Sequence, residues 1–273
     1  MQGNQKKFTR CHKDKNVWQD LYQWFKTPLG EELLRLEKVH TNELLSNLFG
    51  YHLLLLGSPH FVEGIKDSRV SRRAVMDITG VNERTCDGQF SGCPECLPVS
   101  SDVLDVMVLP HILEFSESPH EVLREVERSL VPEGHVVILG FNPFSLWNIW
   151  RWLFSWRKQL PWCGGFISTT RLKDWLALLG FECLETQYFF YRPPLQHKGV
   201  LNKLFIFEKL VSKILPWFGG TYVLVARKKV STLTPIRPRW RTQQKLRAGL
   251  VEPVSRVKGS IKNSLNIKEC DKP

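Results

Sequence analysis

The sequence predicts an α/β domain with a doubly wound, mostly parallel seven-stranded sheet and helices on both faces. Three observations support this prediction. Short apolar strands alternate with amphipathic helices and are joined by short turns. The segments 51–56 and 135–141 are mainly apolar, as is typical of parallel strands covered on both faces. The last two strand candidates, 181–191 and 220–228, are longer and more polar, which favours an antiparallel edge.

The N-terminal part predicts helix followed by a buried strand. In "TPLGEELLRLE", residues 27–37, Thr27 can cap a helix and Pro28 suits its first position. A second amphipathic stretch spans residues 43–48. The run "YHLLLL", residues 51–56, is short, apolar and bounded by glycines, so it predicts a buried strand rather than a helix.

The middle of the chain predicts two more strands on either side of a long loop. The segment 72–77, "RRAVMD", reads as a strand that ends at Asp77. Residues 81–101 are polar and rich in Gly, Pro and Cys, which predicts a loop with one short strand at most. A clear strand, "DVLDVMVL", follows at residues 102–109.

The best-marked helix of the chain is "SESPHEVLREVERSL", residues 116–130. Ser118 and Glu121 have the spacing of a capping box, and Pro119 takes the first helical position. The tetrapeptide "VPEG", residues 131–134, predicts a turn before the strand at 135–141.

Two further helices complete the domain. "STTRLKDWLALLGF", residues 168–181, has an apolar face and ends at a glycine. A largely apolar helix is predicted at 200–218, between the last two strands. These elements predict one domain over residues 18–228, with an aromatic insertion at 143–166 and a flexible N-terminus at 1–17.

The positive charge of the chain is concentrated in its C-terminal tail. The 273 residues carry a net charge of +11, and those from Arg227 onward hold thirteen Lys or Arg against three Asp or Glu, a balance of +10. Residues 229–273 also contain scattered Pro, Gly and Ser, so we predict a mostly disordered tail. It is a solvated extension or, alternatively, a weak electrostatic contact for nucleic acid or anionic lipid.

The composition also limits where the protein acts. No apolar run approaches the length of a membrane span, and no apolar core follows the basic N-terminus as in a signal peptide. The seven cysteines are irregularly spaced, which is typical of reduced thiols. The sequence therefore predicts a cytoplasmic protein.

The block from Cys96 to Pro143 resembles the class I S-adenosylmethionine-dependent methyltransferases, in particular their small-molecule type 11 branch. It contains Leu97-Pro98, Asp105, "ERSLVPEG" and "HVVILGF" in the order and at the spacing typical of that family. The resemblance extends over about residues 18–228. It implies a Rossmann-like fold, S-adenosyl-L-methionine as cofactor and a small-molecule methyl acceptor.

The resemblance also implies where the cofactor would lie. In open α/β sheets the ligand crosses the carboxyl ends of the strands. Asp77 would bind the ribose hydroxyls, although an acidic cap on the strand end is the alternative. The cofactor-binding candidates are Gly57, Ser58, Asp77, Glu95, Cys96, Leu97 and His111.

His111 is the candidate catalytic residue, because the resemblance places it at the pocket floor near the transferred methyl group. A neutral imidazole could serve there as a general base. The alternative is a packed or helix-capping histidine. Glu114 is a second candidate base, and Asn142 either reaches the pocket mouth or starts a turn.

Two departures from the family pattern leave cofactor binding open. The family turn Gly-x-Gly-x-Gly reads Gly57-Ser58-Pro59-His60-Phe61 here, and a proline lacks the amide donor. Cys93 stands where the adenine-contacting Asp is expected, with Glu95 as a nearby substitute. We therefore keep two hypotheses: a methyltransferase acting on a small, possibly apolar acceptor, and a cofactor-free binding or scaffold protein on the same fold.

Two other motifs have alternative interpretations. Cys93-Pro94-Glu95-Cys96 is a lone CxxC without a matching pair, so zinc or redox use is a minor alternative and no metal site is predicted. Residues 143–162 contain five of the ten tryptophans. They predict a lid helix over the site, or a peripheral contact with a membrane.

Overall fold

The computed structural model of this chain describes residues 17–80, 88–148, 150, 164–193 and 215–229. The chain divides after Thr232, so all described residues lie in its first unit. The predictions of a flexible N-terminus, of a disordered tail and of most of the aromatic insertion therefore fall outside the described residues.

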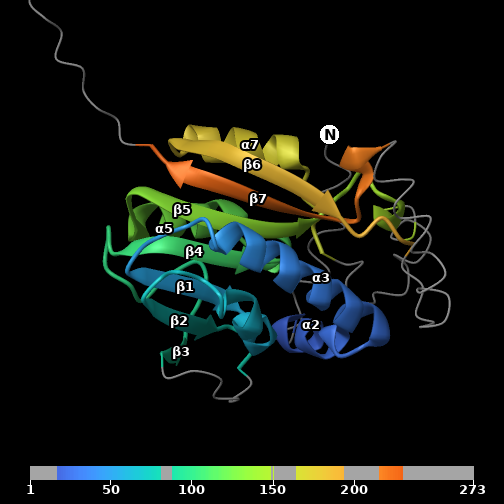
Figure 1. Ribbon diagram of the computed structural model, residues 1–273, viewed down its shortest axis with the longest axis horizontal. Helices are drawn as coiled ribbons and strands as arrows, with labels where there is room; N and C mark the ends of the chain where they lie inside the picture. Colours follow the sequence, from blue (N-terminus) through green and yellow to red (C-terminus); the bar gives the residue numbers. More distant parts are fainter. Residues whose placement is uncertain (1–16, 81–87, 149, 151–163, 194–214, 230–273) are drawn as a thin grey trace, which may run out of the picture. The chain divides into compact units, whose positions relative to one another are not determined.

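Seven strands form one mixed sheet in the order β3-β2-β1-β4-β5-β7-β6 (Figure 1). Strand β7 is antiparallel to both neighbours, β5 and β6, whereas β1 to β5 pair in parallel. This confirms the predicted fold class and places the antiparallel strand one position inside the edge. The strands are β1 (His52–Gly57), β2 (Arg72–Asp77), β3 (Gln89–Ser91), β4 (Leu104–Pro110), β5 (Leu130–Phe141), β6 (Phe181–Phe189) and β7 (Thr221–Lys228).

Helices cover both faces of the sheet (Figure 1). One face packs against α2 and α3 and the 3₁₀ helix η1, and the other against α5 and α7. The helices are α2 (Val17–Phe25), α3 (Pro28–Leu45), α4 (Ile112–Phe115), α5 (Pro119–Ser129) and α7 (Thr169–Leu178), with 3₁₀ helices η1 (Pro59–Ile65) and η3 (Pro216–Phe218).

The four leucines of β1 are shared between two hydrophobic cores. Leu53 and Leu55 belong to the core under α2 and α3, and Leu54 and Leu56 to the core under α5 and α7. All four are at most 1% exposed. Because neighbouring side chains of a strand point to opposite faces, a strand between two covered faces needs apolar residues at every position.

Three local predictions about helices and turns are corrected by the structure. The two predicted N-terminal helical stretches form one helix, α3, which Thr27 caps as expected by accepting a hydrogen bond from the Gly30 amide. Ser118 makes no side-chain capping hydrogen bond, so the predicted capping box is wrong. The "VPEG" turn is absorbed into β5, which begins at Leu130 and shifts register against β4 between Leu104 and Val106.

Candidate functional site

The carboxyl ends of β1, β2 and β4 converge where the resemblance places a cofactor. Gly57, the last residue of β1, is in register with Asp77, the last residue of β2. Gly57 has φ +133°, a conformation that L side chains rarely adopt. A Cβ atom there would lie 3.4 Å from Cγ of Pro110, the last residue of β4, and 3.5 Å from Cδ1 of Ile112, the first residue of α4. The structure therefore has a turn at Gly57, at the end of β1, as the sequence predicted.

The hollow at this edge of the sheet is almost filled. Its volume is about 10 Å³, which is the scale of a single water molecule, whereas pockets for cofactor-sized ligands measure roughly 300–1,000 Å³. One wall comes from the strand ends and η1, and the other from α2. The lining residues are Trp18, Leu21, Tyr22, Phe25, Gly57, Ser58, Phe61, Ile78, Thr79, Pro110 and Ile112.

Aromatic contacts between α2 and the segment after β1 close the hollow. The Tyr22 ring stacks on His60 with 4.1 Å between centroids, and Phe25 meets Phe61 edge-on at 5.7 Å. Pro59 begins η1, and the Ser58 side chain caps this helix by accepting from the His60 amide. The residues that replace the family's glycines thus build a short helix. Together with α2, that helix occupies the crevice.

Asp77 lies at the predicted position but already has partners. Its Oδ1 atom accepts hydrogen bonds from the backbone amide of Thr79 at 2.8 Å and from its hydroxyl at 2.6 Å. The residue is 3% exposed. This geometry is that of a turn-forming strand-end cap, the alternative that the sequence left open. Ligand contact by Asp77 stays a prediction.

Glu95, which was predicted to contact adenine, forms hydrogen bonds with other residues of the protein. Glu95 accepts hydrogen bonds from the Cys93 thiol, at 2.8 Å, and from the Ser116 hydroxyl. Burial raises the pKa of the Glu95 carboxyl, but these two hydrogen bonds, together with hydrogen bonds from backbone amides, outweigh it and lower the pKa overall. Glu95 therefore remains an ionised acceptor that organises the loop, and its predicted contact with adenine stays a prediction.

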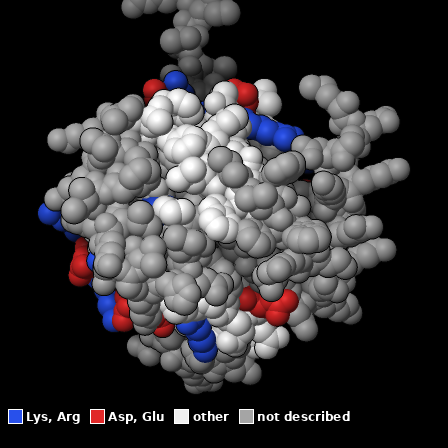
Figure 2. Space-filling view, turned by 90° about the vertical axis from the view of Figure 1, so that its right-hand side faces the viewer, with Lys and Arg blue, Asp and Glu red and all other residues white. Residues whose placement is uncertain are grey.

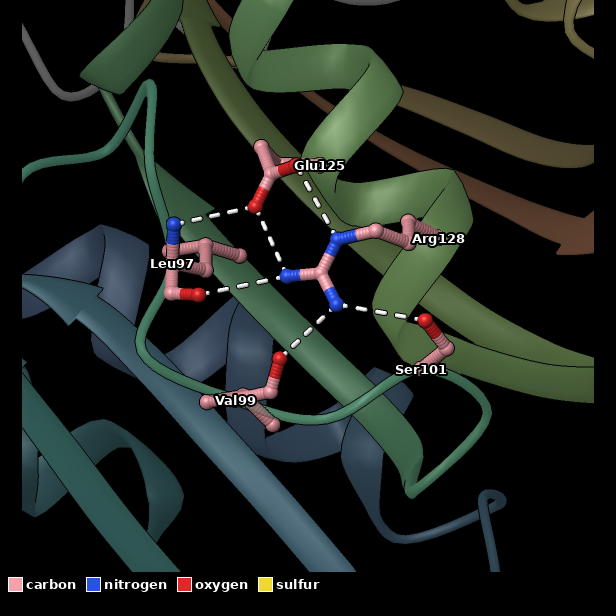
Figure 3. A network of polar contacts seen from close by, with 5 residues as sticks. All are labelled: Leu97, Val99, Ser101, Glu125 and Arg128. Carbon is pink, nitrogen blue, oxygen red and sulfur yellow. Dashed lines mark hydrogen bonds and ion pairs between the residues drawn. The ribbon is translucent and has the colours of Figure 1, made fainter.

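Leu97 and the rest of this loop are tied to α5 by one guanidinium group (Figure 3). Arg128 donates to the carbonyl oxygens of Leu97 and Val99 and to the Ser101 hydroxyl. It also forms a two-point ion pair with Glu125, whose carboxylate accepts from the Leu97 amide. The Arg of "ERSLVPEG" thus fixes the path of the Leu-Pro segment, since a guanidinium has five donors in a rigid plane.

His111 is enclosed between two carboxylates. Its Nε2–H donates to Glu37 and its Nδ1–H to Glu114, each at 2.8 Å, and the His111 side chain is fully buried. The ring stacks on Phe141 with 4.2 Å between centroids. Glu114 also accepts from the backbone amide of Phe141. Two carboxylate acceptors require a proton on both ring nitrogens, so the geometry is that of an imidazolium.

The electrostatics of this buried trio favour a protonated His111. Burial lowers the pKa of His111, but the charge of Glu37 and the hydrogen bonds that the ring donates to both carboxylates outweigh it and raise the pKa to about 10. Burial is the main cause that raises the pKa of Glu114. An imidazole that is protonated at neutral pH has no lone pair to accept a proton. The role of His111 as a base stays a prediction, and the contacts support a structural role.

We predict that the protein loses stability as the pH rises from 7 to 10. The pKa of His111 is higher in the folded state, about 10 against the usual 6.5. Its stabilising contribution is therefore complete below pH 6.5 and disappears as the pH passes 10. Urea unfolding at pH 7, 8, 9 and 10 should show a falling free energy of unfolding, with a shallower slope in His111→Asn. Parallel pH curves for the two proteins would contradict the assignment.

Glu37 is the site residue that the sequence analysis missed. It belongs to the apolar stripe of α3, four residues after Leu33 and eight after Leu29, and is fully buried. A carboxylate on a helix face that is otherwise buried indicates a buried partner. That signal was available in the sequence. The partner, His111, lies 74 residues away in the chain, and only the fold reveals the pairing.

Asn142 and Trp147 both take structural positions. The Asn142 amide group donates to the carbonyl oxygens of Trp217 and Gly219, and its oxygen accepts from the Phe144 amide. Trp147 is fully buried, and its indole N–H donates to the carbonyl of Arg192. Asn142 therefore starts a turn that joins two loops. Residues 149 and 151–162 of the predicted lid lie outside the described residues.

The end of the molecule above the strand ends presents few charges among the described residues. Figure 2 shows this side, where most of the described surface at the centre is neither basic nor acidic.

Within the described ranges, no three His, Cys, Asp or Glu side chains are grouped to hold a metal ion. In the same ranges no helix combines the length and apolarity needed to cross a membrane.

Two comparisons relate the sequence of this chain to known proteins. The family model described as "Methyltransferase domain" (type 11) matches residues 75–138, a range that begins after the turn at Gly57. The "uncharacterized protein YafS" of Escherichia coli is 29% identical over 211 residues, which are 77% of this chain and 82% of YafS.

Two solved structures have the same fold. An S-adenosylmethionine-dependent methyltransferase from Archaeoglobus fulgidus aligns with a TM-score of 0.50 and 17% identity, over 71% of this chain and 94% of that chain. A chain of the complex that contains the Haloferax volcanii Trm112 methyltransferase activator aligns with a TM-score of 0.52 and 15% identity, over 70% of this chain and 88% of its own. The chain thus has the fold of the class I S-adenosylmethionine-dependent methyltransferases, and its residues 75–138 match their type 11 domain.

Proposed function

We propose that this chain is a methyltransferase-fold protein that acts as a binding or scaffold module and not through methyl transfer. The observation that carries this proposal is the filled hollow between α2 and the turn after β1, in which about 10 Å³ remains. In this state the residues present do not fit S-adenosylmethionine. Pro59, which has no amide donor, the occupied Oδ1 atom of Asp77 and the two occupied oxygens of Glu95 support the same conclusion.

The free energy needed to open the crevice also supports the proposal. Leu21, Tyr22 and Phe25 of α2 are 6%, 2% and 2% exposed. Returning three such side chains to water costs about 5 to 9 kcal/mol. A ligand with micromolar affinity gains about 8 kcal/mol on binding. Displacement of α2 would therefore consume most of the binding free energy of such a ligand, so α2 serves the core rather than acting as a loose lid.

The second candidate function is methyl transfer from S-adenosylmethionine to a small, possibly apolar acceptor. One observation favours it: Asp77 stands at the carboxyl end of β2, in register with Gly57, as the family's ribose-binding acid would. In that case α2 would have to leave the crevice before cofactor entered. Gly57, Ser58, Asp77 and the loop Glu95–Leu97 would then face the cofactor.

Calorimetry with S-adenosylmethionine and S-adenosylhomocysteine separates the two candidates. For the full chain we expect no binding heat at ligand concentrations up to about 1 mM, which corresponds to less than about 4 kcal/mol of binding free energy. Mass spectrometry of the purified protein should likewise detect no S-adenosyl compound. Micromolar binding that Asp77→Asn abolishes and Asp67→Asn leaves intact would overturn the proposal in favour of the methyltransferase.

The predicted location of the protein and its predicted contacts with a membrane or with nucleic acid remain proposals. A cytoplasmic location rests on the composition of the chain. In the segment proposed to contact a membrane, Phe144 is 60% exposed whereas Trp147 faces the core, so any such contact would use the outer residues of that segment. The proposed contact between nucleic acid and the basic tail lies outside the described residues.

A further inference from the structure

The CxxC motif forms a closed two-residue turn at the surface. Cys93 and Cys96 are paired by an antiparallel bridge, and the Cys96 amide donates to the Cys93 carbonyl at 3.1 Å. Both cysteines are exposed and carry free thiols. The motif that the sequence analysis treated as a lone CxxC therefore brings two accessible thiols to the two ends of one tight turn.

The turn geometry is close to that of a disulfide. The Cα atoms at the ends of a β-turn lie within about 7 Å of each other, and a disulfide spans about 4.4–6.8 Å between Cα atoms. Directly opposed residues of an antiparallel pair have Cβ atoms about 4.5–5.5 Å apart on the same face. A disulfide needs about 3.8 Å, so a closure of about 1 Å would suffice.

We propose that Cys93 and Cys96 are a reversible dithiol–disulfide site that exchanges with small-molecule disulfides such as glutathione disulfide. The proposal does not depend on whether the fold binds a cofactor. The contacts around the turn support it, because they hold one residue within the turn and the residue that follows it. Glu95 is held by Ser116, and Leu97 by Glu125 and Arg128 (Figure 3). A turn that is already ordered loses little conformational entropy when the disulfide between Cys93 and Cys96 forms.

The exchange proceeds in two balanced steps. The thiolate of one cysteine attacks a sulfur of glutathione disulfide, which forms a mixed disulfide and releases one glutathione thiolate. The thiolate of the other cysteine then attacks the protein sulfur of the mixed disulfide and releases the second glutathione. The two cysteines lose two electrons, glutathione disulfide gains them, and the two thiol protons end on the released glutathione molecules.

Glu95 controls the reactivity of this pair. Its Oε2 accepts a hydrogen bond from the Cys93 thiol, with 2.8 Å between sulfur and oxygen, and this hydrogen bond is the main cause that raises the pKa of Cys93. A raised pKa leaves less thiolate at neutral pH, and the thiolate is the attacking species. Glu95 therefore keeps Cys93 in the thiol form, so the pair reacts slowly until an oxidising disulfide accumulates.

Oxidation of the full chain in glutathione buffers tests the site. After alkylation of the remaining thiols, peptide mass spectrometry should find one peptide in which Cys93 and Cys96 are joined and both escape alkylation. Dithiothreitol should reverse the linkage. Cys93→Ser and Cys96→Ser should each retain a mixed disulfide with glutathione, and Cys183→Ser, the matched control, should form the linkage normally. Stable glutathione adducts on Cys93 or Cys96 of the unsubstituted chain would overturn the proposal. Failure of these two cysteines to become oxidised would overturn it as well.

A second variant tests the role of Glu95. Glu95→Gln removes the carboxylate that holds the Cys93 proton, so at pH 7 the linkage should form about twofold faster or more. The exposed Glu121→Gln should leave the rate unchanged. Equal rates in all three proteins would show that Glu95 does not control the pair.

Discussion

The substitution His111→Asn is expected to lower the free energy of unfolding by about 3 to 5 kcal/mol, the usual cost of removing one partner from a buried ion pair. It leaves Glu37 and Glu114 facing each other in the core without a counter-charge, and both are at most 2% exposed. Asparagine is chosen because His111 has φ +56°, and asparagine tolerates this left-handed conformation. The loss is therefore assigned to charge and not to the backbone.

Urea unfolding followed by tryptophan fluorescence at pH 7 measures this change. His52→Asn is the control, because the hydrogen bond of His52 to Asp105 uses its backbone amide, which the substitution keeps. A loss below about 1 kcal/mol in His111→Asn would show that the trio carries no net stabilisation. If His111→Asn gave no cooperative transition while His52→Asn unfolded normally, the result would still support the prediction.

Trp147→Ala is expected to cost about 3 to 5 kcal/mol, the range for a large aromatic side chain removed from a core. Trp147 packs against three aromatic side chains. Its ring centroid lies 5.5 Å from that of Phe141, 5.3 Å from that of Phe190 and 6.4 Å from that of Trp24 in α2. Truncation leaves a cavity and an Arg192 carbonyl without its indole donor. We also expect α2 to loosen, because Trp24 loses a packing partner.

Trp217→Ala is the matched control for this prediction. Trp217 is 54% exposed, and the hydrogen bond it shares with Asn142 uses its backbone carbonyl. Its replacement should change the free energy of unfolding by less than about 1 kcal/mol. The same denaturation curves report both variants. Similar losses in the two proteins would contradict the central position of Trp147.

The sheet could be predicted from the sequence because burial on both faces leaves a direct pattern. "LLLL" in β1 and "VVIL" in β5 are apolar at every position, and the helices between the strands carry apolar stripes. The resemblance also implied that Gly57 and Asp77 end the first two strands, where the structure has them. Local backbone geometry was predicted less well, as the missing cap at Ser118 illustrates, because several partners compete for the same amide groups.

The contents of the site could not be predicted in the same way. Whether the turn after β1 is open depends on α2, which comes from a segment over 30 residues earlier and fills the hollow with Tyr22 and Phe25. The amphipathic pattern of α2 indicates that it packs, but not against which strand ends. The charge state of His111 likewise depends on Glu37, a partner remote in sequence. Long-range packing, and not local pattern, decides both points.

The filling of the hollow by α2 limits what a substitution in the turn after β1 can achieve. A glycine at position 59 would return an amide donor to the turn, yet Tyr22 would still stack on His60 and Phe25 would still meet Phe61. A cofactor cavity would require several coordinated replacements, because α2 and the turn after β1 fill the hollow together. Under the function proposed above, no single substitution in that turn would therefore be enough to make this chain bind a cofactor.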